Sequence, residues 1–168
     1  MPRSFDMAAD YDGTVEQIHH AFGDQRYWLE RLAESGADEA TLDSITSGVD
    51  GGVDVVTTQT MRADRLPGVV AQFHRGDLSF VREEVWTPVR DGRATATVKG
   101  TIPGAPATLS GTAVLSPTGS GSRLEFTATV EVRIPLVGGK VESFVGGQLV
   151  GLLTAEQNFT TAWIKANA

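Results

Sequence analysis

The sequence predicts an α+β fold in which a curved, seven-stranded antiparallel sheet wraps around one long C-terminal helix. Two short helices are expected between the first and second strands. Three observations lead to this prediction. Short segments with alternating hydrophobicity recur between turn signals, two capped helical segments follow the first of them, and apolar residues repeat at helical spacing after residue 135.

A strand and a pair of short helices are expected at the start of the chain. The strand covers residues 4–12, because apolar residues alternate there with polar or small ones. Thr14 and Gln17 have the spacing of a capping box, so they begin the first helix, which Gly23 ends. Asp24 then caps the second helix. The inward face of the strand consists of Phe5, Met7, Ala9 and Tyr11.

Six further strands follow, and short connections join most of them. Turn signals at residues 50–52, 90–92 and 117–121 predict three hairpins. Residues 64–77 form a longer loop with room for one helical turn. Because the connections are short, neighbouring strands must be antiparallel. The expected strands are residues 42–49, 53–63, 78–88, 93–102, 107–116 and 122–134.

The C-terminal helix begins after a proline- and glycine-containing break at residues 134–139. A helix of about 27 residues would run roughly 40 Å. Because it contains Gly146, Gly147 and Gly151, helix propensity alone does not stabilise it, and it needs a broad apolar surface to lie on. Its apolar stripe, with steps of three and four, consists of Val137, Val141, Phe144, Val145, Gln148, Leu149, Leu152, Phe159 and Trp163.

The inward faces of the strands carry many small residues, which predicts a cavity beneath the helix. Alanine and glycine cannot fill the roughly 10 Å that separates packed layers. Large helix side chains could close this gap instead. Gln148, in the middle of the helix stripe, favours the cavity, because a buried amide without a partner costs about 1–3 kcal/mol. Gln148 could equally bond to a strand backbone. The small residues are Ala96, Gly100, Gly111, Ala113 and Ala128.

This order of elements resembles the START-like superfamily, also called SRPBCC or helix-grip proteins. Within it, Tyr27-Trp28, Leu66-Pro67 and the segment that ends in Trp86 resemble the domain-of-unknown-function 2505 family. The resemblance covers nearly the whole chain. It implies a deep apolar pocket between sheet and long helix that holds a lipid, a polyketide or another hydrophobic molecule, and it brings no catalytic residues.

Composition excludes several classes of function. The 168 residues suit a single domain, residues 1–168, and the net charge of −7 argues against a nucleic-acid partner. Without cysteine, disulfides and thiolate metal sites are impossible, and no histidine spacing suits a metal. No nucleotide-binding motif indicates a cofactor. The chain has neither a signal-peptide core nor a membrane-spanning run, so a cytoplasmic location is expected.

The candidate ligand contacts come from the second helix, the 64–77 loop, the inward sheet faces and the long helix. In the strand at residues 78–88, Arg82 and Glu84 share a face with Trp86, and the sequence leaves open whether that face points inward or to solvent. The expected ligand-binding residues are Tyr27, Trp28, Phe73, His74, Arg82, Trp86, Phe126, Phe144, Gln148, Leu152, Glu156 and Phe159.

Three functions remain open from the sequence. The first is binding or carrying a hydrophobic small molecule, such as a lipid or a polyketide-like compound. The second is an enzyme of the cyclase, aromatase or dehydratase type, for which His74, Glu84 or Glu156 would have to supply the acid or base. The third is an interaction module, such as a homodimer. Its surface on the long helix would consist of Val150, Leu153 and Ile164.

Overall fold

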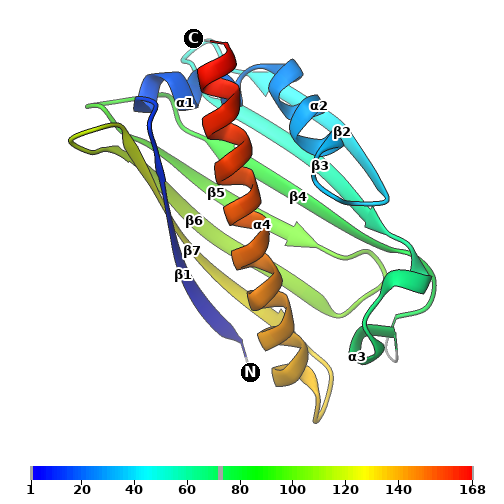
Figure 1. The fold of residues 1–168 in the computed structure, drawn as a ribbon. Coiled ribbons are helices and arrows are strands. Elements are labelled where there is room, and N and C mark those ends of the chain that lie inside the picture. The colour runs from blue at the N-terminus through cyan, green and yellow to red at the C-terminus, as the bar shows by residue number, and fades with distance from the viewer. Residues whose placement is uncertain (1, 72–73, 168) are drawn as a thin grey trace.

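The computed structural model describes residues 2–71 and 74–167, and these residues form one antiparallel sheet with a long helix across it (Figure 1). The sheet order is β1-β7-β6-β5-β4-β3-β2, and every neighbouring pair is antiparallel. The strands are β1 (Arg3–Tyr11), β2 (Glu39–Ser47), β3 (Val53–Met61), β4 (Leu78–Trp86), β5 (Ala94–Thr101), β6 (Ala107–Pro117) and β7 (Ser122–Val132). The helices are α1 (Val15–Phe22), α2 (Gln25–Ala33), α3 (Gly68–Ala71) and α4 (Gly138–Ala166), with a 3-10 turn at Ala63–Arg65.

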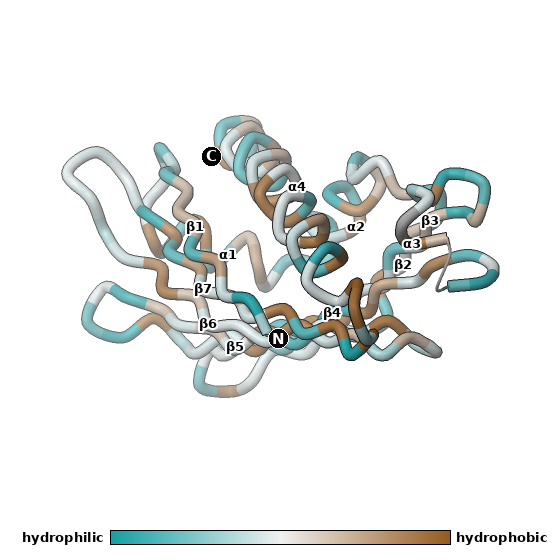
Figure 2. Tube along the Cα trace, turned by 90° about the horizontal axis from the view of Figure 1, so that it is seen from below, coloured by the Kyte–Doolittle hydropathy of each residue, from teal (hydrophilic) through white to brown (hydrophobic). Residues whose placement is uncertain are grey.

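The predicted α+β fold, its curved seven-stranded sheet and its helices are confirmed. From below (Figure 2), the sheet curves under α4, and α1 and α2 lie on the same side of the sheet as α4. The predicted caps are present. The Thr14 hydroxyl accepts a hydrogen bond from the Gln17 amide at 3.1 Å, and the Gln17 side chain accepts one from the Thr14 amide at 2.9 Å. Asp24 caps α2 by accepting from the Arg26 amide at 2.9 Å.

A tight connection between β7 and α4 fixes where the long helix begins. Leu136 has a φ of 72°, in the left-handed region. Gly138 is required, because a Cβ there would lie 2.5 Å from the Val132 carbonyl oxygen. The fully buried Glu142 on the first turn of α4 accepts a hydrogen bond from the Val132 amide at 2.9 Å. The end of the last strand and the start of the helix are therefore held together.

The structure resolves which face of β4 points toward α4. Arg82 and Trp86 are buried, whereas Val85 on the opposite face is 42% exposed. Phe80, Arg82, Glu84 and Trp86 therefore face inward, and a polar cluster lies inside the molecule rather than in solvent.

The interior has two apolar regions. An aromatic core fills the space between α1, α2, the last turns of α4 and the sheet, with Tyr27 and Trp28 fully buried in it. A smaller cluster, including Leu109, Val130 and Val141, lies under the first turns of α4. Among residues 2–71 and 74–167, no helix is both long and apolar enough to cross a bilayer.

Candidate ligand-binding site

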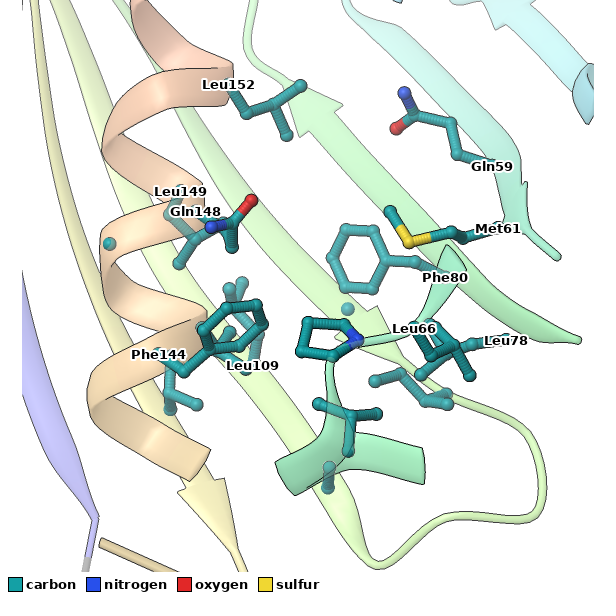
Figure 3. A pocket seen from close by; sticks show the side chains of 18 of the residues that line it. Gln59, Met61, Leu66, Leu78, Phe80, Leu109, Phe144, Gln148, Leu149 and Leu152 are labelled. Carbon is teal, nitrogen blue, oxygen red and sulfur yellow. The ribbon is translucent and has the colours of Figure 1, made fainter. Parts of the chain in front are cut away.

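A cavity of about 710 Å³ lies between the first half of α4 and the sheet (Figure 3). Its walls come from α4, from β3 to β7 and from the segment at residues 65–70. This arrangement follows from the sequence: α4 presents a stripe of residues three and four positions apart, and the strands present alternate side chains. The side chains that define the cavity include Met61, Leu66, Leu78, Phe80, Leu109, Phe144, Leu149 and Leu152.

Two of the small strand residues make room for phenylalanine rings. A Cβ on Gly100 would lie 2.6 Å from the Phe80 ring, and one on Gly111 would lie 3.0 Å from the Phe126 ring. Large side chains thus fill part of the expected gap, but they come from neighbouring strands and not from the helix. The space that remains lies between these side chains and α4.

The helix wall of the cavity contains two glycines that packing does not explain. Gly147 and Gly151 both line the cavity, and a Cβ at either position would meet nothing within 4 Å. Gly146, by contrast, faces the ring of Phe5 so closely that a Cβ there would collide with it. Glycine weakens a helix by roughly 0.5–1 kcal/mol relative to alanine. The absent side chains at 147 and 151 leave the cavity larger than alanine or leucine would.

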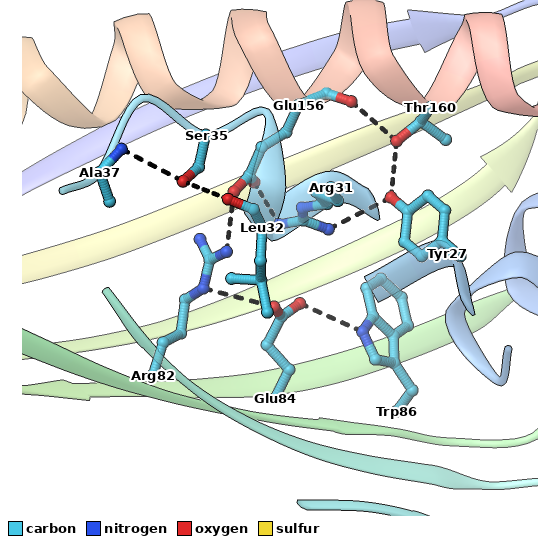
Figure 4. A network of polar contacts seen from close by, with 10 residues as sticks. All are labelled: Tyr27, Arg31, Leu32, Ser35, Ala37, Arg82, Glu84, Trp86, Glu156 and Thr160. Carbon is cyan, nitrogen blue, oxygen red and sulfur yellow. Dashed lines mark hydrogen bonds and ion pairs between the residues drawn. The ribbon is translucent and has the colours of Figure 1, made fainter. Parts of the chain in front are cut away.

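A charged network lies further along α4, between the cavity and the aromatic core (Figure 4). Glu156 is at its centre: its carboxylate oxygens lie 2.5 Å from the Arg31 guanidinium and 2.7 Å from that of Arg82. Arg82 also pairs with Glu84 at 3.4 Å. The Trp86 indole donates to Glu84 at 3.3 Å. Two arginines thus face two glutamates, and the network is electrically balanced.

Hydrogen bonds connect this network to α2 and to the backbone of α4. Arg31 donates to the Tyr27 hydroxyl at 3.2 Å, and that hydroxyl shares a 2.7 Å hydrogen bond with Thr160. Thr160 donates in turn to the Glu156 carbonyl oxygen at 2.7 Å. The Arg31 guanidinium also lies 4.5 Å from the centre of the Trp28 ring, within the range of a cation–π contact.

The network has strong effects on ionisation. Burial alone would raise the pKa of Glu156, but the nearby Arg31 and Arg82 guanidinium groups outweigh it and lower the pKa to about 2. Burial raises the pKa of the Tyr27 hydroxyl above its ordinary value. Burial also raises the pKa of Tyr11, whose side chain lines the same region. At neutral pH the carboxylate of Glu156 is therefore charged and both tyrosines are protonated.

A second, smaller cavity of about 60 Å³ lies at the network. It shares Phe80, Leu109 and Leu149 with the large cavity as lining residues, so the two are neighbours. Its polar walls are Arg31, Arg82, Glu84, Glu156 and Thr160.

The structure divides the predicted ligand contacts into several groups. Phe144, Gln148 and Leu152 line the large cavity. Tyr27, Trp28 and Phe159 line neither cavity; the first two are fully buried in the aromatic core, and Phe159 packs against it. Ligand contact by these three residues stays a prediction, and the cavity linings do not support it. Four further candidates, Arg82, Trp86, Phe126 and Glu156, line the small cavity.

The loop candidate that the structure describes, His74, does not line the large cavity. The His74 imidazole lies 3.0 Å from the Asp77 carbonyl oxygen and is not among the residues that line either cavity. Phe73 lies outside the described residues.

Gln148 differs from its prediction in one respect. It lines the cavity but is exposed rather than buried. The cost of burying an amide without a partner is therefore no argument for a cavity at this position.

Sequence reasoning missed Gln59 and Met61 on β3, as well as the part played by Arg31. Val53, Val55 and Thr57 are buried, and Gln59 and Met61 continue the same inward face toward the cavity. That alternation was available in the sequence. Arg31 could not be found this way, because nothing in the spacing of α2 says that its side chain meets Glu156 on α4.

The proposed interaction surface on α4 is smaller than expected. Val150 is 50% exposed, but Leu153 and Ile164 are partly buried and pack against the aromatic core. Homodimer formation stays a prediction. The packing of Leu153 and Ile164 against the core does not support it.

Comparison with known sequences gives two findings. A family model described as "Protein of unknown function (DUF2505)" matches residues 6–164. The chain is also 55% identical, over 173 aligned residues covering 99% of both chains, to the uncharacterized protein Rv0481c of Mycobacterium tuberculosis (strain ATCC 25618 / H37Rv).

Solved structures share the fold at low sequence identity. TTHA0849 from Thermus thermophilus is 17% identical, with a TM-score of 0.56 over 100% of this chain and 99% of that one. Ara h 8.0201 is 11% identical, with a TM-score of 0.58 over 96% and 99%. Together with the element order, these likenesses place the fold among the START-like, helix-grip folds.

Proposed function

The chain belongs to the family described as "Protein of unknown function (DUF2505)", and on that premise we propose that it binds a hydrophobic small molecule between α4 and the sheet. The observation that carries the proposal is the cavity of about 710 Å³. Ligand sites are typically concave, mostly apolar and about 300–1,000 Å³ in volume. The fold also resembles that of ligand-binding helix-grip proteins.

The chemistry of the walls supports binding more than catalysis. Affinity would come from burying apolar surface, at about 25 cal/mol per Å². Of the three acid or base candidates, His74 does not line the large cavity, and Glu84 and Glu156 are engaged with arginines. Since the pKa of Glu156 is about 2, this group holds no proton to donate at neutral pH. A lipid or polyketide-like molecule would suit these apolar walls. The function of the protein would then be to bind or carry such a molecule.

The proposal is tested by filling the cavity from the helix. In Gly151→Phe, a ring would enter the cavity from a position where an added Cβ meets nothing within 4 Å. Gly151→Ala is the matched control, because it removes the same glycine but leaves most of the volume free. Binding of the hydrophobic dye Nile red is measured by fluorescence. We expect the Phe variant to lose at least tenfold in affinity and the Ala variant to stay within about threefold of the unchanged protein.

Native mass spectrometry of the purified protein gives a second test. A retained hydrophobic compound that is present in Gly151→Ala and absent from Gly151→Phe supports the proposal. Equal dye affinity in both variants, with both folded by circular dichroism, would show that the dye binds elsewhere and that the cavity is not the site.

A further inference from the structure

We propose that the ligand is an electrically neutral, mainly apolar molecule whose hydroxyl or amide group lies between Gln59 and Gln148. This inference rests on the proposed function, because it names the class of molecule that the same cavity would select.

Two glutamines line the cavity from different elements. Gln59 lies on β3 and Gln148 on α4, and both line the cavity. Figure 3 shows them on opposite walls, each with its amide end directed into the space between helix and sheet. Within the described part of the chain, no hydrogen bond joins either side-chain amide to another protein group. Their hydrogen-bonding capacity is therefore available to a bound molecule.

The cavity offers no unpaired charge to an ionised ligand. Among the described residues that line it, Arg65 is the one charged side chain, and its guanidinium lies 2.5 Å from the Asp38 carboxylate. In the neighbouring small cavity, the Arg82 guanidinium lies between Glu84 and Glu156. A ligand carboxylate would have to compete with these internal carboxylates for either arginine.

These two conditions define the preferred chemistry. Transferring a carboxylate or an ammonium group from water to an apolar site is costly unless it finds an opposite charge. A hydroxyl or amide group costs much less, and it both donates and accepts hydrogen bonds. Each glutamine amide has an acceptor oxygen and a donor NH₂ group, so two of them can satisfy such a group from both sides. The remaining walls, such as Leu109, Phe144 and Leu152, would contact the apolar part of the ligand.

The test compares probes of equal chain length that differ in one end group. Dodecanol, dodecanamide and dodecanoate compete with Nile red at neutral pH. We expect dodecanol and dodecanamide to displace the dye at concentrations at least tenfold below that of dodecanoate. Dodecanoate as effective as dodecanol would overturn the inference.

Two substitutions connect this preference to the glutamines. In the double variant Gln59→Leu with Gln148→Leu, the side chains keep similar size but lose both amides. We expect dodecanol and dodecanamide to lose about tenfold relative to dodecanoate, with each competition referred to the Nile red affinity measured for the same variant. Gln25→Leu, an exposed glutamine at the start of α2 and outside the cavity, is the control and should change neither value. The inference would also be overturned if the three probes displaced Nile red from the double variant in the same order and with the same concentration ratios as from the unchanged protein.

The outcomes separate the two proposals. If Nile red binds and Gly151→Phe blocks it, but the end group of the probe makes no difference, the cavity binds hydrophobic molecules and the role of the glutamines is wrong. If neither the dye nor any probe binds, the proposed function fails, and the inference about its ligand fails with it.

Discussion

Glu156 shows how much one side chain in this fold depends on its neighbours. It is a carboxylate on the long helix with two arginines against it, one from α2 and one from β4. Removing one partner from such a buried arrangement typically costs about 3–5 kcal/mol, because the opposite charges stay behind without compensation. Glu156 therefore connects three elements that lie far apart in the sequence.

The lowered pKa of Glu156 predicts how stability changes in acid. A carboxyl whose pKa is lower in the folded protein stabilises the fold above its unfolded pKa, near 4.5, and this contribution disappears as the pH falls toward about 2. Glu156→Gln should therefore lower the free energy of unfolding at neutral pH by about 3 kcal/mol. It should also weaken the fall in stability between about pH 4.5 and 2, as measured by urea unfolding at several pH values.

The exposed Glu30 on α2 supplies the control for this measurement, and Glu30→Gln should leave both quantities nearly unchanged. A Glu156→Gln protein as stable as the original at neutral pH would show that the network does not hold α4 in place.

Helix α4 combines glycines of two kinds within two adjacent positions. Gly146 is required by the ring of Phe5, whereas an added Cβ at Gly147 meets nothing within 4 Å. The sequence shows both as helix-weakening residues and cannot tell them apart, since the difference depends on what faces each position.

Alanine substitutions should separate the two glycines. Gly147→Ala should raise the free energy of unfolding by roughly 0.5–1 kcal/mol, because alanine is the better helix former. Gly146→Ala should lower it by about 1–3 kcal/mol, because the methyl group forces the Phe5 ring to move. Urea unfolding of both variants measures the difference, and two changes of the same sign would contradict this account of the helix.

The sequence predicted those helices and strands that are defined by capping residues or by alternating hydrophobicity. The Thr14–Gln17 box, the Asp24 cap and the alternation of β5 and β7 depend on neighbours in the chain, and the structure confirms them. The direction of β4 was not predictable. Arg82 and Glu84 look like solvent-facing residues until Arg31 and Glu156 arrive from other elements to balance them. For the same reason, Tyr27 and Trp28 could not be assigned to the core or to the ligand site.

At the scale of the whole molecule, the packed and hollow regions occupy different halves. The aromatic core joins α1, α2 and the last turns of α4, whereas the large cavity lies under residues 141–155 of that helix. In Figure 1 the C-terminal end of α4 lies beside α1 and α2, and its first turns lie at the opposite end, nearer α3. A ligand in the cavity would therefore add apolar contacts to the less filled half.

Ligand binding should consequently raise the melting temperature. A molecule that binds only the folded state stabilises it by about 2.7 kcal/mol when its concentration is about 100 times its dissociation constant. For a chain of this length, each kcal/mol corresponds to roughly 2–4 °C, so dodecanol at that concentration should raise Tm by about 5–10 °C. Differential scanning calorimetry measures the shift. Gly151→Phe should show almost none, and an equal shift in that variant would mean that dodecanol stabilises the protein from another site.

The separation of the two halves also bears on how relatives of this chain could diverge. Substitutions at wall positions such as Leu109, Phe144 or Gly151 would alter the shape of the void while leaving the ring cluster around Tyr27 and Trp28 intact. One scaffold would then accommodate new cargo through a few mutations, without first acquiring compensating changes to keep it folded.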